Sequence, residues 1–227
     1  MSPLIHVYNG ANQRTSQATT DNSWWYYPSG TRTITYTANA LNQYTAVGAV
    51  TPTYDANGNL TSDGTFTYGY DAENRLTSAS GAGNTVSYAY DARGRRKRKT
   101  VNGVTTLYVT DADNREVLEY DGASGQVLRW YAYGAGSNDV LNCMDVVANT
   151  RQTFIPDLQG SVLATLDSST AALTKRGYLT YGESASATGS FAYAGLRIDA
   201  ETNGLYYARA RMYAPGLGRF LQPAPIG

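Results

Sequence analysis

The sequence predicts an all-β protein made of antiparallel β-hairpins, and three observations lead to this prediction. The chain contains 20 Tyr and 23 Gly against 4 Phe and 3 Met, a balance that favours strands and tight turns over helices. Polar and apolar residues alternate in short segments such as 84–90, which is the period-two pattern of a half-buried strand. A turn-forming phrase that begins Tyr-Asp recurs at intervals of 16 to 20 residues.

Length and charge limit the classes of protein that the chain can belong to. The 227 residues fit one large β unit or two small domains, and no linker rich in Pro, Ser or charge divides them, so we expect one structural domain. The formal net charge of zero gives no global field toward nucleic acid, and no nucleic-acid partner is expected. No apolar run approaches the length of a membrane span, and the first residues lack the pattern of a signal peptide, so we expect no membrane insertion.

Cysteine and histidine are too scarce for several kinds of site. Cys143 is the single cysteine and cannot form a disulfide within the chain, and His6 is the single histidine. A Cys/His zinc site is therefore excluded, and we expect neither a metal nor another cofactor. Cys143 is interpreted as a small buried hydrophobic residue, and a catalytic triad built on His6 is not expected.

Residues 1–45 are expected to form lead-in strands less regular than those that follow. They contain the aromatic run Trp24-Trp25-Tyr26-Tyr27, followed by the turn signal Pro28-Ser29-Gly30. One interpretation is a platform on which sugar rings stack. The other is a strand whose adjacent aromatic side chains point to opposite faces and are covered by neighbouring strands.

Residues 46–133 contain the clearest repeats. The phrases begin at Tyr54-Asp55, Tyr70-Asp71 and Tyr90-Asp91, and a worn copy begins at Thr110-Asp111. The Asp can accept backbone N–H groups in an Asx-turn, and a residue that tolerates positive φ follows it, as Gly58, Asn74, Gly94 and Asn114 do. Each repeat is therefore predicted to be one hairpin that pairs with its neighbours, with the tyrosine rings facing the core.

Two polar patterns inside these repeats have alternative interpretations. The basic run from Arg93 to Lys99 is interpreted as a solvated strand; the alternatives are contact with a phosphate backbone, or with an acidic cargo or partner. The spacing Asp55-x-Asn57-x-Asn59 is similar to the start of an EF-hand loop. It lacks the glycine and the acid required later in that loop, so calcium is not expected.

Residues 134–192 are predicted to continue the strands, and residues 193–227 form the last unit. In this unit 199–205 is predicted to be a turn and 205–213 one strand, in which Tyr207, Arg209 and Arg211 share a face. Pro215 and Gly216 end this strand, and a short strand follows at 218–221.

Three parts of the sequence resemble the RHS/YD-repeat family. The Tyr-Asp phrases resemble YD repeats, with repeat-turn residues Tyr54, Asp55, Gly58, Tyr70, Asp71, Tyr90, Asp91 and Gly94. The segment 154–162 is similar to the strand-turn-strand that precedes the RHS core segment, and 195–227 resembles that core segment. Its matching positions are Arg197, Tyr207, Arg209, Arg211, Gly218, Arg219, Pro225 and Gly227.

This resemblance implies a shell that encloses another polypeptide. In the RHS toxins, the Tc-toxin C components and the teneurin-like shells, hairpin repeats curl into a spiral β-shell that a C-terminal plug closes. The implied partner is an enclosed C-terminal toxin or effector segment, with a delivery protein of a secretion system, and the implied location is secreted or on a bacterial cell surface. Because a partial shell has unpaired edges, the remaining shell repeats or another copy of the chain are further expected partners.

The family also implies an aspartyl-protease-like pair that cuts the chain shortly after the core segment. The family pattern ends in Asp-Pro-x-Gly, and Ala224 occupies the acidic position here. The other member of the pair is Glu201 or Asp199. Since alanine has no titratable group, self-cleavage is expected to be disabled unless Asp199 and Glu201 suffice together.

Two other interpretations remain open. Asp199 and Glu201 can instead form a turn or pair with Arg197, Arg209 or Arg211. The whole chain can instead be an adhesive or carbohydrate-binding repeat module at a cell surface. A grid of exposed aromatic side chains would support the adhesive module, whereas aromatic side chains buried between strands would support the shell.

Overall fold

The structure is a computed structural model that describes residues 5–11, 13–18, 33–136, 138–184 and 189–224. In these ranges the regular elements are β-strands and three short 3-10 turns, η2 (Tyr193–Gly195), η3 (Ala200–Thr202) and η4 (Pro215–Leu217). The all-β prediction is therefore confirmed.

Most strands belong to one antiparallel sheet of 13 strands, in which each strand pairs with the strands before and after it in the chain. The strands are β5 (Thr53–Tyr54), β6 (Leu60–Ser62), β7 (Phe66–Tyr70), β8 (Leu76–Gly81), β9 (Asn84–Tyr90), β10 (Arg96–Val101), β11 (Val104–Thr110), β12 (Glu116–Asp121), β13 (Val127–Tyr133), β14 (Val140–Asp145), β15 (Thr150–Pro156), β16 (Val162–Asp167) and β17 (Leu173–Lys175). The sheet continues from β13 to β14, which pair with each other, so it extends on both sides of the boundary between 133 and 134. Strands β5 and β17 lie at its edges.

The repeat turns are five-residue Asx loops that share one hydrogen-bond pattern. In the loop that begins at Asp71, the Asp71 carboxylate accepts the N–H groups of Glu73 and Arg75 at 3.0 and 2.9 Å, and the Asp71 N–H donates to Arg75 O. Asn74 has φ of 61°. The same pattern begins at Asp55, Asp91, Asp111 and Asp157.

The described part of the lead-in is more regular than the sequence indicated. Strands β1 (Ile5–Tyr8) and β2 (Arg14–Ala18) form one hairpin, and β3 (Tyr36–Ala38) and β4 (Tyr44–Val47) form another. The loops of both hairpins have the same Asx pattern, which begins at Asn9 and at Asn39. These repeats escaped notice in the sequence because asparagine replaces the aspartate. Residues 24–30 lie outside the described residues.

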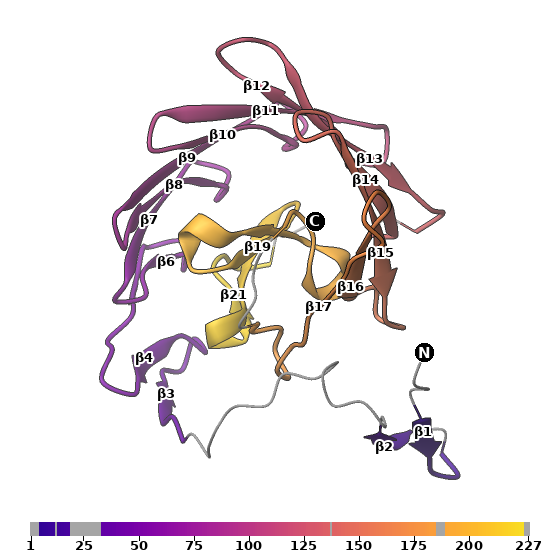
Figure 1. The fold of residues 1–227 in the computed structure, drawn as a ribbon. Coiled ribbons are helices and arrows are strands. Elements are labelled where there is room, and N and C mark those ends of the chain that lie inside the picture. The colour runs from indigo at the N-terminus through magenta and orange to yellow at the C-terminus, as the bar shows by residue number, and fades with distance from the viewer. Residues whose placement is uncertain (1–4, 12, 19–32, 137, 185–188, 225–227) are drawn as a thin grey trace.

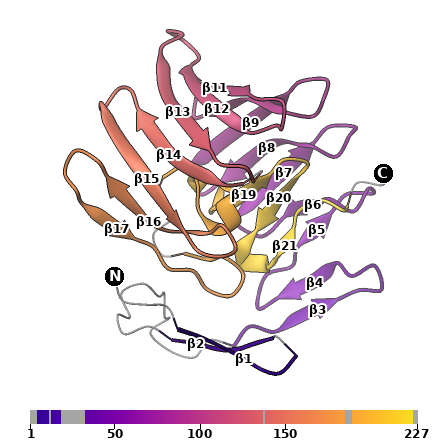
Figure 2. The ribbon, with the colours of Figure 1, turned by 90° about the vertical axis from the view of Figure 1, so that its right-hand side faces the viewer.

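The large sheet curves into an arc around the end of the chain, as Figures 1 and 2 show. From here on, we use the name core segment for residues 189–224, which include the described part of 195–227 and the six residues before it. It contains a four-stranded antiparallel sheet of β18 (Arg197–Asp199), β19 (Leu205–Ala208), β20 (Arg211–Ala214) and β21 (Arg219–Phe220), and this sheet lies on the concave side of the arc.

The predicted single strand 205–213 is wrong in one respect. Strand β19 ends at Ala208, and Arg209 lies in a turn with φ of 60°, after which β20 begins at Arg211. Tyr207, Arg209 and Arg211 therefore do not share one face of one strand. The sequence did not reveal this turn because it consists of only two residues, 209 and 210, which interrupt the alternation of polar and apolar residues very little.

The concave side of the arc holds the main hydrophobic core. Inward side chains of β6 to β9, including Leu60, Phe66, Leu76 and Val86, pack against Leu205, Tyr207, Met212, Ala214 and Leu221 of the core segment. A second cluster joins β13 to β16 with Phe191. The sheet and the core segment thus share one interior, so neither buries its apolar face alone.

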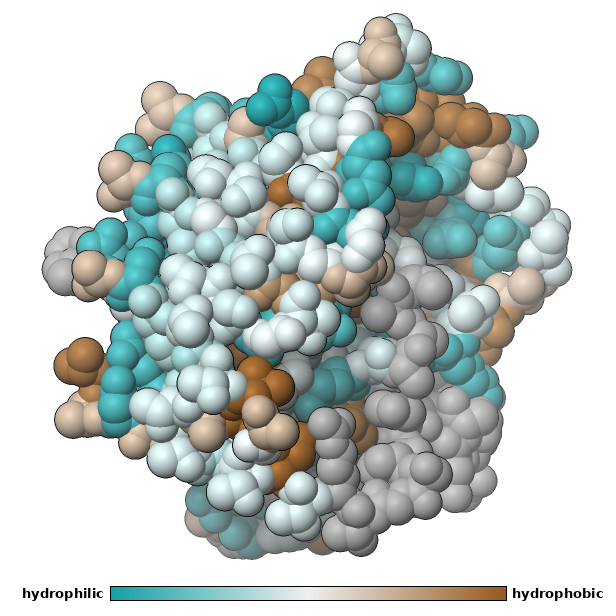
Figure 3. Space-filling view, turned by 90° about the vertical axis from the view of Figure 1, so that its left-hand side faces the viewer, coloured by the Kyte–Doolittle hydropathy of each residue, from teal (hydrophilic) through white to brown (hydrophobic). Residues whose placement is uncertain are grey.

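The convex face of β7 to β9 differs sharply from the concave face. Its outward residues are small and hydroxylic, as at Thr67, Ser78, Ser80 and Thr85, all of which are exposed. Figure 3, which views this side of the molecule, shows a mostly pale surface that is neither strongly hydrophilic nor strongly hydrophobic. The alternation of these strands therefore places the aromatic rings inside.

Candidate functional site

The core segment is anchored along the rim of the large sheet that carries the Asx loops. In three repeats, the first residue after the loop donates its backbone N–H to the core segment. The bonds are Leu60 N–H to Leu221 O (2.8 Å), Arg96 N–H to the Tyr207 hydroxyl (3.1 Å) and Val162 N–H to Ala192 O (3.0 Å). The regular spacing of the loops thus sets a row of docking points.

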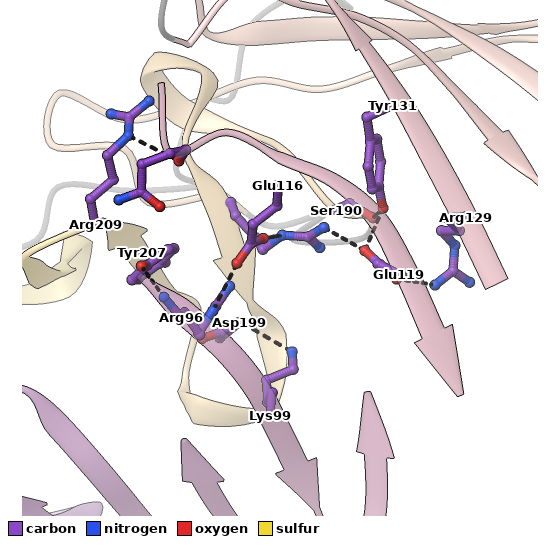
Figure 4. A network of polar contacts seen from close by, with 12 residues as sticks. Arg96, Lys99, Glu116, Glu119, Arg129, Tyr131, Ser190, Asp199, Tyr207 and Arg209 are labelled. Carbon is purple, nitrogen blue, oxygen red and sulfur yellow. Dashed lines mark hydrogen bonds and ion pairs between the residues drawn. The ribbon is translucent and has the colours of Figure 1, made fainter. Parts of the chain in front are cut away.

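Arg96 in β10 lies at the centre of this contact and is 0 % exposed. Its Nη1 donates to Asp199 of β18 at 2.7 Å, and its Nε donates to Glu116 of β12 at 3.0 Å (Figure 4). Tyrosine rings surround the guanidinium, with Arg96 Cζ to ring-centroid distances of 5.7 Å for Tyr88, 5.0 Å for Tyr108 and 4.0 Å for Tyr207. The cation is therefore compensated by both carboxylates and aromatic faces.

Lys99 of the same strand adds a second positive charge to the two acidic residues of the core segment. Its Nζ donates to the other Asp199 oxygen at 3.0 Å and pairs with Glu201. Asp199 is 0 % exposed. Each of its carboxylate oxygens pairs with a different cation of the sheet, Arg96 or Lys99.

Arg197 of β18 extends the contact in the opposite charge sense. It is buried and pairs with Glu116 and Glu119 of β12. Glu119 also accepts the Tyr131 hydroxyl at 2.5 Å and Arg129 Nη1 at 3.1 Å (Figure 4).

These side chains form what we call the charge network. From the sheet it contains Arg96, Lys99, Glu116, Glu119 and Arg129; from the core segment it contains Arg197, Asp199 and Glu201. Positive and negative charges alternate along it, so each buried charge has an opposite partner.

The network favours the ionised form of two carboxylates, those of Asp199 and Glu119. Burial alone would raise the pKa of Asp199, but the positive charges of Arg96 and Lys99 outweigh it and lower the pKa to about 2. Burial is likewise outweighed at Glu119, chiefly by Arg197, so the pKa of Glu119 lies below its usual value. Asp199 cannot donate a proton near neutral pH. In an aspartyl pair it could act only as the ionised member.

A polar cavity of about 520 Å³ adjoins the network on the concave side. Its lining includes Lys99, Glu119, Arg129 and Glu201, together with Cys143. Burial raises the pKa of the Cys143 thiol to about 11, so the thiolate is scarce at neutral pH. Cys143 is buried, as the sequence indicated, and the cavity holds charges that are already paired.

The structure revises the partners of the two candidate acidic residues. The sequence left open a pairing of Asp199 and Glu201 with Arg197, Arg209 or Arg211, but their ion-pair partners are Arg96 and Lys99. The reason is that β18 directs Asp199 toward the sheet.

The remaining arginines of the core segment make packing and pairing contacts. Arg209 donates to Asn138 Oδ1 at 3.0 Å. Arg211 Cζ lies 3.7 Å from the Phe220 ring centroid. Arg219 donates to Asn42 O at 2.6 Å, and its Cζ lies 4.2 Å from the Tyr44 ring centroid. Gly218, with φ of 64°, forms the turn that precedes β21.

The expected cleavage motif lies at the end of the described chain. Ala224 is exposed, and Pro225 and Gly227 lie outside the described residues. The preceding residues return to the first repeat, where Pro223 Cγ approaches Gly58. The contacts of Asp199, in contrast, are with β10.

The interpretation of 93–99 as a solvated strand is wrong for two of its residues. Arg96 is fully buried, and the Lys99 side chain is 14 % exposed. Both point to the concave side, where acidic partners from β12 and the core segment compensate them. A run of like charges in the sequence conceals such an arrangement because the compensating acids come from distant segments.

Sequence reasoning missed Arg96, Glu116 and Glu119, although a signal for two of them exists. The fifth residue after the loop aspartate is Leu60 or Leu76 in the first repeats, and both are buried. At the equivalent positions the next two repeats have Arg96 and Glu116. Charges at apolar repeat positions, opposite in sign and one repeat apart, predict a buried pair.

In the part of the chain that the structure describes, no cluster of His, Cys, Asp and Glu could hold a metal ion. Within the same ranges, no helix is long and apolar enough to span a membrane.

A family model described as the teneurin YD-shell matches residues 5–225. Among curated proteins, the tRNA3(Ser)-specific nuclease WapA of Bacillus spizizenii is 36 % identical over 121 residues, which are 50 % of this chain and 5 % of the nuclease.

Solved structures with a similar fold include a Tc holotoxin pore and a TcdB2–TccC3 crystal structure. The Photorhabdus luminescens Tc holotoxin pore with a mutated TccC3 component matches with a TM-score of 0.64 and 16 % identity, over 100 % of this chain and 16 % of that chain. A TcdB2–TccC3 crystal structure matches with a TM-score of 0.63 and 17 % identity, over 99 % of this chain and 16 % of that chain. The chain therefore spans a small part of the proteins it matches.

Proposed function

The chain belongs to the teneurin YD-shell family, and on this premise we propose that it forms part of a shell wall that encloses a C-terminal toxin or effector polypeptide. The coarse role, a curved β-shell, follows from the fold. The enclosed cargo is the proposal. It is supported by relatives that are described as a Tc toxin and as a nuclease.

The burial of tyrosines within the strands of the large sheet is the observation that carries this proposal. Tyr68, Tyr88, Tyr108 and Tyr131 are 4–6 % exposed and face the concave side. An adhesive or carbohydrate-binding module needs such rings at its surface. The described convex face of β7 to β9 instead presents hydroxyl groups and small side chains, which favours the shell over the adhesive module.

Edge strands supply the expected contacts to other parts of a shell. Strands β5 and β17 each have one side without a partner strand in the large sheet. Unpaired edges favour association with further strands. We propose that the remaining shell repeats or another copy of the chain pair there, and that a delivery protein of a secretion system carries the assembled shell. The proposed location is secreted or at a bacterial cell surface.

We also propose that self-cleavage is disabled at Ala224. Asp199 supplies an ionised carboxylate, and Glu201 is paired with Lys99. An aspartyl pair needs a second carboxyl that holds a proton. Alanine at position 224 cannot supply it.

Intact mass at neutral pH tests the cleavage proposal. The chain is extended by a C-terminal tail and compared with the same extended chain carrying Ala224→Asp. We expect cleavage only in the aspartate version, and Asp199→Asn in that background should abolish it. Cleavage of the unchanged Ala224 chain would contradict the proposal.

Protection of the tail tests containment separately. The tail includes a protease site and is added to the Ala224 chain, with the same site inserted in the exposed Asn102-Gly103 turn as a control. We expect the tail site to be cut at least about tenfold more slowly than the turn site, because enclosed segments must open before cleavage. Equal rates would show that this chain alone does not enclose the tail.

A further inference from the structure

The Asx-loop repeats contain a regular tyrosine ladder. The tyrosine before one loop donates its hydroxyl to the carbonyl of the first residue after the preceding loop. Tyr70 donates to Leu60 O at 2.6 Å, and Tyr90 donates to Leu76 O at 2.8 Å. Each bond links one repeat to the next, so the ladder stabilises the series of hairpins.

The ladder is interrupted in the middle of the sheet. Thr110 occupies the tyrosine position before the fourth loop of the series, and a threonine is too short for this bond. The residues after the third and fourth loops are Arg96 and Glu116, at positions where Leu60 and Leu76 are buried in the first repeats. This repeat therefore lacks both the ring and the apolar side chains of its neighbours.

Tyr207 of the core segment lies where the interruption occurs. Its hydroxyl accepts the Arg96 N–H at 3.1 Å, and its ring centroid lies 4.0 Å from Arg96 Cζ. Tyr207 is buried, and its pKa is raised to about 12 by burial, so the hydroxyl stays protonated. The core segment thus supplies an aromatic ring to the repeat whose ladder position holds Thr110 instead of a tyrosine.

Strand β18 faces the same interruption with two opposite charges. Asp199 pairs with Arg96 and Lys99, whereas Arg197 pairs with Glu116 and Glu119. The two side chains are separated by one residue and lie on the same face of β18. A reversed strand, or one shifted by two residues, would place like charges together or leave a buried charge unpaired.

We propose that the interrupted repeat is a recognition site that fixes the direction and register of the core segment by reading Arg197, Asp199 and Tyr207. Apolar burial against β6 to β9 is non-directional and tolerates sliding. Buried ion pairs discriminate because a mismatched charge destabilises the wrong arrangement strongly. This inference concerns the chain's own C-terminal segment, and it does not depend on an enclosed cargo.

A variant that restores the regular repeat tests the proposal in the full chain. It carries Arg96→Leu, Thr110→Tyr and Glu116→Leu. We expect amide hydrogen exchange in β18 to β20 to accelerate about 100-fold, the size typical of losing a buried charge partner, and exchange in β7 to β9 to accelerate clearly less. The matched control carries Glu73→Leu and Arg75→Leu, an ion pair in the Asp71 loop outside the charge network, and should leave β18 to β20 protected.

A charge exchange provides a test that a general loss of stability cannot imitate. The sheet exchange is Arg96→Glu with Glu116→Arg, and the core exchange is Arg197→Glu with Asp199→Arg. Each exchange alone should accelerate amide hydrogen exchange in β18 to β20 about 100-fold, because like charges then face each other. Together they should recover protection by at least about tenfold.

The outcomes decide between recognition and ordinary packing. Unchanged protection of β18 to β20 in the repeat-restoring variant would overturn the proposal. Loss of protection by equal factors in the sheet and the core segment would also overturn it, because the charges would then contribute only to the general stability of the shared interior. If the combined exchange protects β18 to β20 no better than either single exchange, the pattern of charges does not determine how the core segment docks. None of these outcomes bears on containment of a tail.

Discussion

The sheet holds the same core segment by different forces in two regions. Strands β6 to β9 present apolar side chains such as Phe66 and Leu76 to Leu205 and Met212. Strands β10 to β12 present Arg96, Lys99, Glu116 and Glu119 to two charged residues of β18. Separate parts of one repeat series can therefore provide affinity and register: buried apolar area provides the affinity, and buried charges determine the register.

Removing the central cation should have the largest effect on stability. Arg96→Leu leaves Asp199 and Glu116 buried without the guanidinium, and the free energy of unfolding should fall by about 4 kcal/mol. Urea denaturation followed by circular dichroism measures this change. Arg96→Leu combined with Asp199→Leu should be less destabilising than Arg96→Leu alone, because the unpaired carboxylate is also removed. A double variant that is less stable than the single variant would contradict this view of the charged region.

A cavity in the apolar region should have a somewhat smaller effect. Leu76 is 0 % exposed, and Leu76→Ala should lower the free energy of unfolding by about 3 kcal/mol, through lost burial and the cavity that remains. The register of the core segment should survive, since the charge network is untouched. Hydrogen exchange should therefore accelerate in the sheet and the core segment by similar factors. A selective loss in β18 to β20 would blur the distinction between the two regions.

Acid should weaken the charged region before the apolar region. The pKa of Asp199 is lowered in the folded state, from 3.8 to about 2, by Arg96 and Lys99. A lowered folded pKa stabilises the fold above the unfolded value, and this contribution is lost as the pH falls from about 4 to about 2. The lowering corresponds to about 2 kcal/mol.

The double variant Arg96→Leu with Asp199→Leu isolates this contribution from the loop aspartates, several of which also have lowered pKa values. Urea denaturation between pH 7 and pH 2 should show a flatter acid decline for the double variant than for the unchanged chain. Identical declines would mean that Asp199 does not contribute to the acid dependence.

The sequence predicted the apolar region better than the charged region, and the reason is the range of the interactions. The Asp71 loop forms from neighbours within five residues, so composition and spacing reveal it. The partners of Arg96 are Glu116 and Asp199, which are 20 and 103 residues away. Only the broken repeat pattern at Arg96, Thr110 and Glu116 marked the place, and no local pattern identified the partner in β18.

The hydroxyl ladder provides the finest test of how the repeats differ. Tyr70→Phe keeps the buried ring and removes the bond to Leu60 O, so the free energy of unfolding should fall by about 1 kcal/mol. Tyr36→Phe is the control, since Tyr36 is 42 % exposed and its change should stay within about 0.5 kcal/mol. Urea denaturation of both variants gives the comparison. If Tyr70→Phe proves as mild as its control, the ladder does not stabilise the series, and the interruption at Thr110 has no energetic meaning.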